Sequence, residues 1–378
     1  MKKLLFISLI VIAAVSCSND NKESGPIKVK YNLVTGEQIL RSDFIKRIEV
    51  IPLQTESAPI VGDQVTSMVI MDGIIYYFDP HGNQKLLLYD LKGNFLNTIG
   101  TVGNGPEEYI DVDNFWINDD GTVSMYSSSQ NMECVYKKTG EFIRKVDQKL
   151  EPYQMVRRGD WEYFYFGEGR GPEYKLTVMN NESGERSDYL RDHGVISMSI
   201  AAPIFTRYEE GYFVCEPWGN DILWMESGKE PEIKYTFDYG EYNLPKEFFA
   251  NGFEGSMDYL MDHPFLVKDL FVESDNYSIL SNIITKISDS TAFCLFGIHD
   301  KSKRDWRWLK LNVPGPNEVV SAGAQLFTGG GMKYVDNEAV YFVAEPMLLK
   351  EAGLSDLIPE IQKFSDDDNT VILKCYLR

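Results

Sequence analysis

The hydrophobic positions of this chain fall in short apolar segments that are separated by polar turns containing glycine. In the clearest repeat, strands are expected at residues 66–71, 74–78, 86–89 and 95–99. Asp72-Gly73 and Lys92-Gly93 lie between neighbouring strands, where glycine supplies the positive φ that a tight hairpin requires. The pattern predicts a unit of four antiparallel strands, here called A to D in chain order.

The same unit recurs along most of the remaining chain. Further copies are expected at residues 114–146, 154–190, 204–237, 269–311 and 333–377. The last copy lacks its strand D, which the early segment 44–53 could supply. Such a strand would close a ring of sheets and leave no exposed edge between them. The sequence thus predicts an all-β fold, a six-bladed β-propeller whose N-terminal strand closes the last blade; a β-sandwich or two barrels is the alternative.

Two segments interrupt the repeats with helical patterns. One starts at Leu244, has Pro245 in its first turn and continues with a second helix at 256–261, while the other covers residues 347–364. Both lie in connections that join strand B to C or strand D to the next A. Because chain direction reverses at every turn, these connections emerge on one face of a propeller. We therefore expect two short helical insertions that partly roof the channel on that face.

The N-terminus has the features of a bacterial export signal. Met1-Lys2-Lys3 precedes an apolar run that is too short to span a membrane, and small residues stand directly before Cys17. This arrangement predicts a signal peptide at 1–16, lipidation at Cys17, a tether at 17–40 and a single propeller domain at 41–378. The expected location is the cell envelope, anchored to the outer membrane on its periplasmic or surface side. Plain secretion with Cys17 as an incidental thiol is the alternative.

Composition narrows the range of partners. The 378 residues include 37 basic and 57 acidic side chains, which gives a net charge of −20. Nucleic acid is therefore not an expected partner, because its phosphates require a basic surface. The remaining cysteines, Cys134, Cys215, Cys294 and Cys375, each stand in an apolar strand, so they are expected to be buried thiols and not disulfides.

The chain resembles the six-bladed propeller lipoproteins that are abundant in gut Bacteroidetes, which are distantly similar to NHL-type repeat propellers. The resemblance covers nearly the whole mature chain. It rests on Cys17, Ile51-Pro52-Leu53, Gly103-Asn104-Gly105-Pro106-Glu107-Glu108-Tyr109, Leu244-Pro245-Lys246-Glu247 and Asp367-Asp368-Asn369-Thr370-Val371-Ile372-Leu373. It implies a propeller in the cell envelope and no agreed activity, and it supplies no catalytic residues.

Polar and aromatic residues on the loops of the expected roofed face are candidate ligand contacts. These candidates are His81, Asn83, Glu168, Arg170, Glu216, Trp218, Asn220 and Asp221. Trp218 could stack on a sugar ring while Asn220 and Asp221 bond to its hydroxyls, or it could pack against a neighbouring blade. Arg170 could clamp a carboxylate or pair with Glu168.

The sequence favours a binding or scaffold module over an enzyme. Its expected partners are the membrane, through the lipid anchor, and a glycan, a peptide or an envelope protein. No nucleophile elbow or zinc-protease motif occurs. The alternatives are a hydrolase or lyase that uses carboxylates or a metal at the channel mouth, and a structural role in an envelope complex. No cofactor is expected, although calcium could bind where carboxylates of several blades meet.

Overall fold

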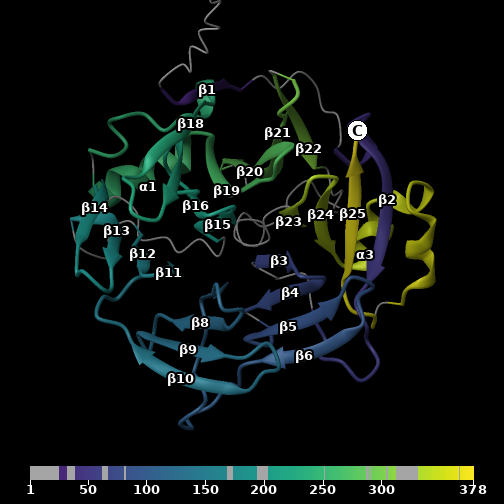
Figure 1. The fold of residues 1–378 in the computed structure, drawn as a ribbon. Coiled ribbons are helices and arrows are strands. Elements are labelled where there is room, and N and C mark those ends of the chain that lie inside the picture. The colour runs from purple at the N-terminus through teal and green to yellow at the C-terminus, as the bar shows by residue number, and fades with distance from the viewer. Residues whose placement is uncertain are drawn as a thin grey trace, which may run out of the picture.

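The chain forms six β-sheets around a common axis (Figure 1). The structure is a computed structural model and describes residues 25–31, 39–61, 67–80, 82–167, 173–193, 203–250, 252–286, 288, 291–303, 305–311, 331–365 and 367–378. The four-stranded meanders are the blades of a propeller, so the predicted all-β, six-bladed fold is confirmed.

The first three blades each consist of four consecutive strands. Blade 1 contains β3 (Ser67–Met71), β4 (Ile74–Asp79), β5 (Lys85–Asp90) and β6 (Phe95–Ile99). Blade 2 contains β7 (Asn114–Ile117), β8 (Val123–Ser127), β9 (Met132–Tyr136) and β10 (Phe142–Asp147). Blade 3 contains β11 (Gln154–Arg158), β12 (Trp161–Tyr165), β13 (Tyr174–Asn180) and β14 (Arg186–Arg191).

The other three blades follow the same plan, with additions from the N-terminal segment. Blade 4 contains β15 (Phe205–Tyr208), β16 (Gly211–Val214), β17 (Asp221–Glu226), β18 (Glu232–Asp238) and β1 (Ile27–Lys30). Blade 5 contains β19 (Phe265–Glu273), β20 (Tyr277–Lys286), β21 (Thr291–Asp300) and β22 (Trp306–Leu311). Blade 6 contains β23 (Met332–Val335), β24 (Ala339–Ala344), β25 (Val371–Leu377) and β2 (Ile45–Pro52).

Strand β2 closes the ring as predicted. It pairs antiparallel with the C-terminal β25, in a register that runs from Ile45 opposite Leu377 to Pro52 opposite Val371. Figure 1 shows the two strands side by side at the edge of blade 6. The first and last parts of the chain are therefore held in one sheet.

Burial along the blades explains the apolar pattern of the sequence. Strands in the middle of a sheet, such as β4 and β9, are buried along almost their whole length, because adjacent blades cover both faces. Outer strands such as β10 and β14 contain exposed residues at several positions. The tight turn between β3 and β4 has positive φ at Asp72 and Gly73, as its Asp-Gly sequence predicts.

Strand β1 is an addition that the sequence pattern did not predict. It lies within the segment expected to be a tether and pairs in parallel with β18, with Ile27 opposite Tyr235. Val29 is buried there, and the Tyr31 ring packs edge-on against Trp308 at a centroid distance of 5.3 Å. A short 3₁₀ helix, η1 (Ile39–Arg41), follows before β2.

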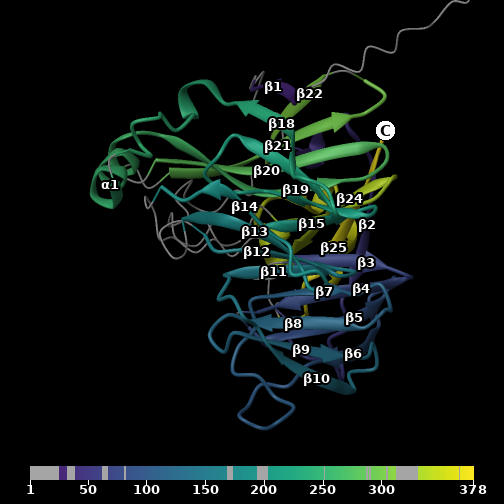
Figure 2. The same cartoon turned by 60° about the vertical axis from the view of Figure 1, so that its left-hand side comes forward.

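The first predicted insertion contains one true helix, α1 (Gly252–Asp262), after the short 3₁₀ turn η2 (Gly240–Tyr242). The helix expected from Leu244 is wrong, because Phe248, Phe249 and Ala250 donate to carbonyls three residues earlier and form successive turns instead. In Figure 2, α1 projects to the left of the blades. The insertion packs between blades 4 and 5 around Trp218, Phe248 and Phe265.

The second insertion is a broken helix and not the continuous one expected over 347–364. It contains α3 (Pro346–Glu351), η4 (Leu354–Asp356) and η5 (Pro359–Lys363). Gly353 has a positive φ of 66° and Pro359 starts η5, and each of them ends the helix before it. The insertion packs against blades 5 and 6, and Arg41 joins it to η1 through Asp356 at 2.8 Å.

The four cysteines of the described chain are free and buried, in agreement with their expected role as core residues. Within the described ranges there is also no helix with the length and apolar character needed to cross a membrane.

Candidate functional site

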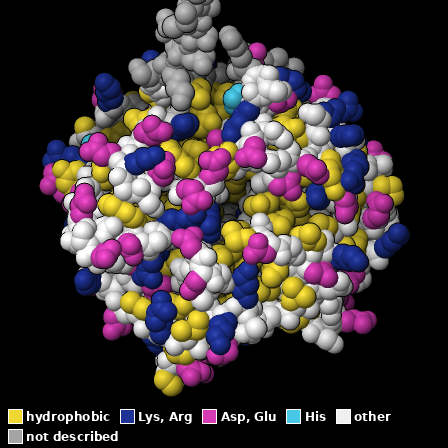
Figure 3. Space-filling model, viewed as in Figure 1, with side chains coloured by type: hydrophobic (Ala, Val, Ile, Leu, Met, Phe, Trp, Pro, Cys, Tyr) yellow, Lys and Arg dark blue, Asp and Glu magenta, His cyan; other side chains and the backbone are white. Residues whose placement is uncertain are grey.

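An axial cavity of about 470 Å³ lies between the innermost strands of the blades. All six inner strands, β3, β7, β11, β15, β19 and β23, contribute lining residues. Figure 3 looks along the axis and shows the face hollowed at its centre, with hydrophobic and charged side chains around the hollow. A volume of this size is typical of sites for small molecules.

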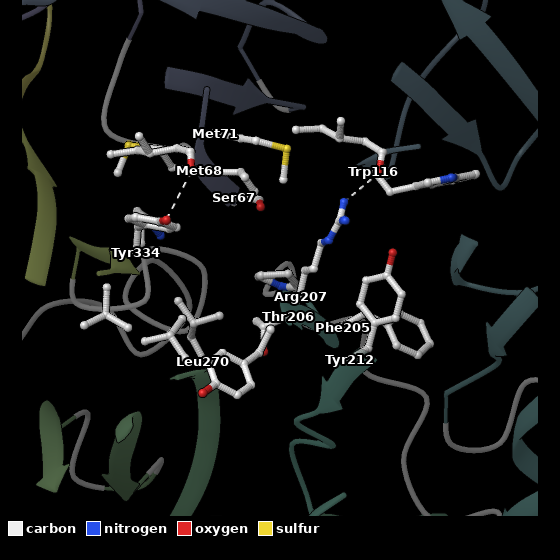
Figure 4. A pocket seen from close by; sticks show the side chains of 18 of the residues that line it. Ser67, Met68, Met71, Trp116, Phe205, Thr206, Arg207, Tyr212, Leu270 and Tyr334 are labelled. Atoms are coloured by element: carbon white, nitrogen blue, oxygen red, sulfur yellow. Dashed lines mark hydrogen bonds between the residues drawn. The ribbon is translucent and has the colours of Figure 1, made fainter. Parts of the chain in front are cut away.

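The cavity wall is mostly apolar and aromatic. Met68, Trp116, Phe205 and Leu270 lie around it on four different blades (Figure 4). Trp116 is almost fully buried, and its indole N–H donates to Asn118 at 2.9 Å, so the ring is fixed in the wall. Tyr334 is fixed in the same way, because its hydroxyl donates to the carbonyl of Ile70 at 3.1 Å (Figure 4). These contacts give the cavity a largely preformed shape.

The cavity extends between the two faces of the propeller: Asp113 and Pro203 line it just before β7 and β15, in connections from one blade to the next, and turn residues line it at the other face. Glu209, Asp275 and Asp336 line it, and each belongs to a turn that joins an inner strand to the next strand of its blade. The two insertions leave from the face opposite the A–B turns, and none of their described residues lines the cavity. The expected helical roof over the channel is therefore wrong: the helices pack between blades instead.

Arg207 crosses the cavity. It extends from β15 in blade 4 past blade 3 to blade 2, where its Nη1 donates to the carbonyl of Ile117 at 3.1 Å (Figure 4). Its Nη2 lies 3.5 Å from a carboxylate oxygen of Asp119, in the A–B turn of blade 2. Asp119 also pairs with Arg158 of blade 3 at 3.3 Å. The guanidinium therefore lies against blade 2, between a backbone carbonyl and the half-exposed carboxylate of Asp119.

The carboxylates near the cavity mouth are mostly engaged by partners of their own. Glu273 pairs with Lys301 at 2.8 Å and accepts a bond from the Tyr235 hydroxyl. Asp275 accepts bonds from the Tyr208 hydroxyl and from the Asn337 amide. Asp336 accepts from two backbone N–H groups of its turn and from the Tyr341 hydroxyl. Glu209 differs, being solvent-exposed on its turn.

A buried charge pair supports the wall. Lys333 on β23 lines the cavity and interacts electrostatically with Asp269 on β19, and both side chains are buried. Burial raises the pKa of Asp269, and the Lys333 ammonium opposes that rise. This pair joins blades 5 and 6.

Several predicted site residues lie outside the described residues. They are Cys17, His81, Glu168 and Arg170. Asn83 is described, and its amide donates to Asp79 at 3.0 Å and to the carbonyl of Ile60 at 2.7 Å, so it stabilises the B–C turn of blade 1.

Trp218 is packed in the core of the first insertion. It is only 5% exposed, and the rings of Phe248 and Phe265 stack on it at centroid distances of 6.5 Å and 6.2 Å. Its neighbours Asn220 and Asp221 bond to Asn243 and to the Thr236 hydroxyl. This is the packing role that the sequence left open as the alternative to sugar stacking.

Glu216 belongs to a buried charge cluster between blades 3, 4 and 5. Its carboxylate lies 3.4 Å from the ammonium of Lys175 and accepts a bond from the Tyr165 hydroxyl. Burial alone would raise the pKa of Glu216, but the charges of Lys175 and Lys268 outweigh it and lower that pKa. Lys268 is fully buried, which lowers its own pKa, and it donates to the carbonyl of Asp221.

None of the described candidates lines the cavity, so sequence reasoning missed the residues that surround it. Those residues stand on the inner strands, where polar side chains are unusual. One signal was available: Thr206 and Arg207 are polar residues inside a short inner strand. Within the described residues, no group of three or more His, Cys, Asp or Glu side chains is placed to hold a metal ion.

Comparisons with known proteins relate the chain to others of this fold. Among solved structures, a "Putative exported protein" of Bacteroides fragilis has a TM-score of 0.72 at 13% identity, covering 93% of this chain and 99% of its own. A member of the duf4221 family from Bacteroides vulgatus has a TM-score of 0.53 at 8% identity, covering 88% and 96%. Virginiamycin B lyase from Staphylococcus aureus reaches only 0.40 at 13% identity, covering 88% and 99%, too low to support an argument about chemistry. No curated protein matches the sequence.

At these identities the structural likenesses establish the fold alone. The family assignment comes from the sequence, which matches the family described as "Domain of unknown function (DUF4934)" over residues 26–376. That match spans all six blades, including β1 and β2. The chain therefore belongs to the DUF4934 family.

Proposed function

We propose that this protein is an exported, lipid-anchored propeller that binds a small, mainly apolar ligand in its axial cavity. The observation that carries the proposal is the cavity itself, which has a volume of about 470 Å³ and is lined by side chains from all six inner strands. A preformed apolar space with a few polar groups is the usual form of a small-molecule site.

Binding is favoured over catalysis by the state of the carboxylates. A hydrolase or lyase would need an acid and a base that converge on a substrate. Glu273, Asp275 and Asp336 are instead held by the hydrogen bonds and the ion pair described above. These carboxylates therefore serve to join blades and stabilise turns.

The proposal is tested by filling the cavity. Ser67 on β3 lies at the cavity wall (Figure 4), and among the described residues no hydrogen bond involves its side chain. In Ser67→Phe the added ring should occupy the space, so the affinity for the neutral fluorescent probe N-phenyl-1-naphthylamine should fall about tenfold or more, equivalent to roughly 1.4 kcal/mol. Fluorescence titration of the folded domain measures this affinity.

Ser187→Phe is the matched control. Ser187 is half-buried like Ser67 but lies on β14, the outer strand of blade 3, away from the cavity. The control should bind the probe as the wild type does. Absence of probe binding to the wild type, or equal loss in both variants, would refute the cavity as the binding site.

A further inference from the structure

We propose that the ligand of the axial cavity is an amphipathic anion, with an apolar body held by the wall and a single carboxylate or sulfonate-like group bound by Arg207. This inference rests on the proposed function and specifies the chemistry of the site. It follows from three observations about Arg207: its unused donors, the state of its neighbours and the arrangement of Asp119.

Most of the hydrogen-bond donors of Arg207 have no partner among the described residues. A guanidinium carries five N–H groups, and within the described residues only the bond to Ile117 at 3.1 Å uses one of them. The contact with Asp119 at 3.5 Å is an ion pair that is longer than a good hydrogen bond. The side chain is 26% exposed, so much of it is removed from water. Such a group binds an anion well, because planar guanidinium matches the two oxygens of a carboxylate.

The other charged groups at the cavity have partners of their own or face solvent. Asp113 accepts a hydrogen bond from the backbone N–H of Ser128. Lys333 is buried beside Asp269 in the wall, and Glu273 is neutralised by Lys301. Asp275 and Asp336 already accept hydrogen bonds from neighbouring side chains. The exposed Glu209 lies on its turn at the solvent side. Arg207 is therefore the charged group of the described lining that combines a position across the cavity with free hydrogen-bonding capacity.

Asp119 marks the side from which an anion can approach. Its carboxylate lies beside Arg207 and is itself half exposed, at 50%. Asp119 also contacts Arg158 at 3.3 Å, so it keeps a cationic partner when a ligand takes its place at Arg207. The exchange therefore leaves no charge buried without a counter-charge, which is the usual obstacle to such a step.

The test compares two probes with the same skeleton. 1-Anilinonaphthalene-8-sulfonate carries an anionic group, whereas N-phenyl-1-naphthylamine is neutral and otherwise alike. On the wild-type domain at low ionic strength, the anionic probe should bind about tenfold more tightly. In Arg207→Met, which keeps an unbranched apolar side chain but removes the guanidinium, this advantage should disappear while the neutral probe binds as before.

The outcomes separate this inference from the proposed function. Suppose that the neutral probe binds the wild type and that Ser67→Phe weakens this binding, but that the wild type does not prefer the anionic probe. The inference is then overturned, while the proposed function of the cavity as a binding site is retained. If Arg207→Met weakens the binding of both probes equally, Arg207 shapes the cavity and does not select for an anionic group, which also overturns the inference.

Arg186→Met is the control for the loss of one positive charge, because Arg186 is an exposed residue on β14. This variant should leave the preference for the anionic probe unchanged. Because the wild-type comparison needs no variant, a variant that fails to fold leaves the test intact.

Discussion

Glu216 illustrates how single residues hold the blades together. Its carboxylate lies among the buried ammonium groups of Lys175 and Lys268, which belong to the blades on either side. Burying charges is costly unless they are paired, and removing one partner leaves the others without compensation. The cluster therefore stabilises the contact between these blades only while the carboxylate of Glu216 is ionised.

Glu216→Gln should therefore destabilise the protein at neutral pH by about 3–5 kcal/mol, the usual cost of breaking a buried pair. The pKa of Glu216 is lower in the folded protein than its ordinary value of 4.5, so its contribution is complete above that value and is lost as pH falls through the folded-state pKa. The difference between wild type and variant should shrink on acidification. Urea unfolding at several pH values measures it.

Glu182→Gln is a suitable control, because Glu182 is exposed in the turn after β13. It should change stability little at any pH. A gap between Glu216→Gln and wild type that stays constant down to pH 3 would contradict a role for the ionised carboxylate.

Trp218 and Arg207 show that the sequence indicates the type of a candidate residue but not the contacts that it makes in the fold. An aromatic residue in a loop suggests a stacking surface, but Phe248 and Phe265 come from a later segment and cover its faces. Arg207 was visible as a charged residue in an inner strand, yet its reach to Ile117 and Asp119 depends on how blades 2 and 4 face each other. Local sequence does not encode that distance.

At the scale of elements, the strands were the most predictable part of the chain. Apolar runs bounded by turns such as Asp72-Gly73 indicate their own hairpins, because the turn and the strands are local. Strand β1 could not be predicted, because four residues with one buried side chain do not form a recognisable hydrophobic pattern. The second insertion was expected as one helix, but Gly353 and Pro359 divide it.

Removing β1 and removing β2 should have different effects. A chain that starts at residue 39 lacks Val29 and the aromatic contacts of Tyr31, but β2 still closes the propeller. Its melting temperature should fall by only a few degrees, since about 1 kcal/mol corresponds to 2–4 °C in a domain somewhat smaller than this one. Size-exclusion chromatography should show a monomer, and circular dichroism should show a cooperative transition.

A chain that starts at residue 54 lacks β2 and leaves β25 with an unpaired edge. It also lacks Ile51 and Leu53, which are buried between blades 6 and 1. Exposed strand edges promote association, so this chain should aggregate or fail to fold. A monomeric product that melts like the longer chain would show that closure by β2 is dispensable.

At the scale of the whole molecule, the propeller separates two faces. A–B turns of blades 4, 5 and 6 line the cavity at one face, and the helical insertions leave from the other face. The sequence predicted the ring, the closing strand and the side from which the insertions leave, since these follow from strand counting. It placed the candidate ligand contacts on loops of the insertion side, but none of those that the structure describes lines the cavity, which extends to both faces.

The proposed membrane anchor lies in the segment before the propeller. Cys17, which lies outside the described residues, is the proposed lipidation site. Cys17→Ser should abolish incorporation of an alkyne-labelled palmitate and move the protein from the membrane fraction to the soluble fraction. Probe binding in the cavity should not change, because the substitution lies outside the propeller. A wild-type protein that carries no label would exclude the anchor.

The pairing of β2 with β25 also constrains the order of folding. A chain with an N-terminal export signal crosses the membrane from its amino end, so β2 emerges long before the strand that it must join. Blades 1 to 5 can assemble as they appear, but blade 6 remains unfinished until the carboxyl end has crossed. Contacts between the two ends of a chain form slowly because of the loop entropy that they must overcome. During that interval the incomplete sheet is vulnerable to proteases and to pairing with other unfolded chains, so we expect chaperones that hold unfolded chains to matter most at the final step of maturation.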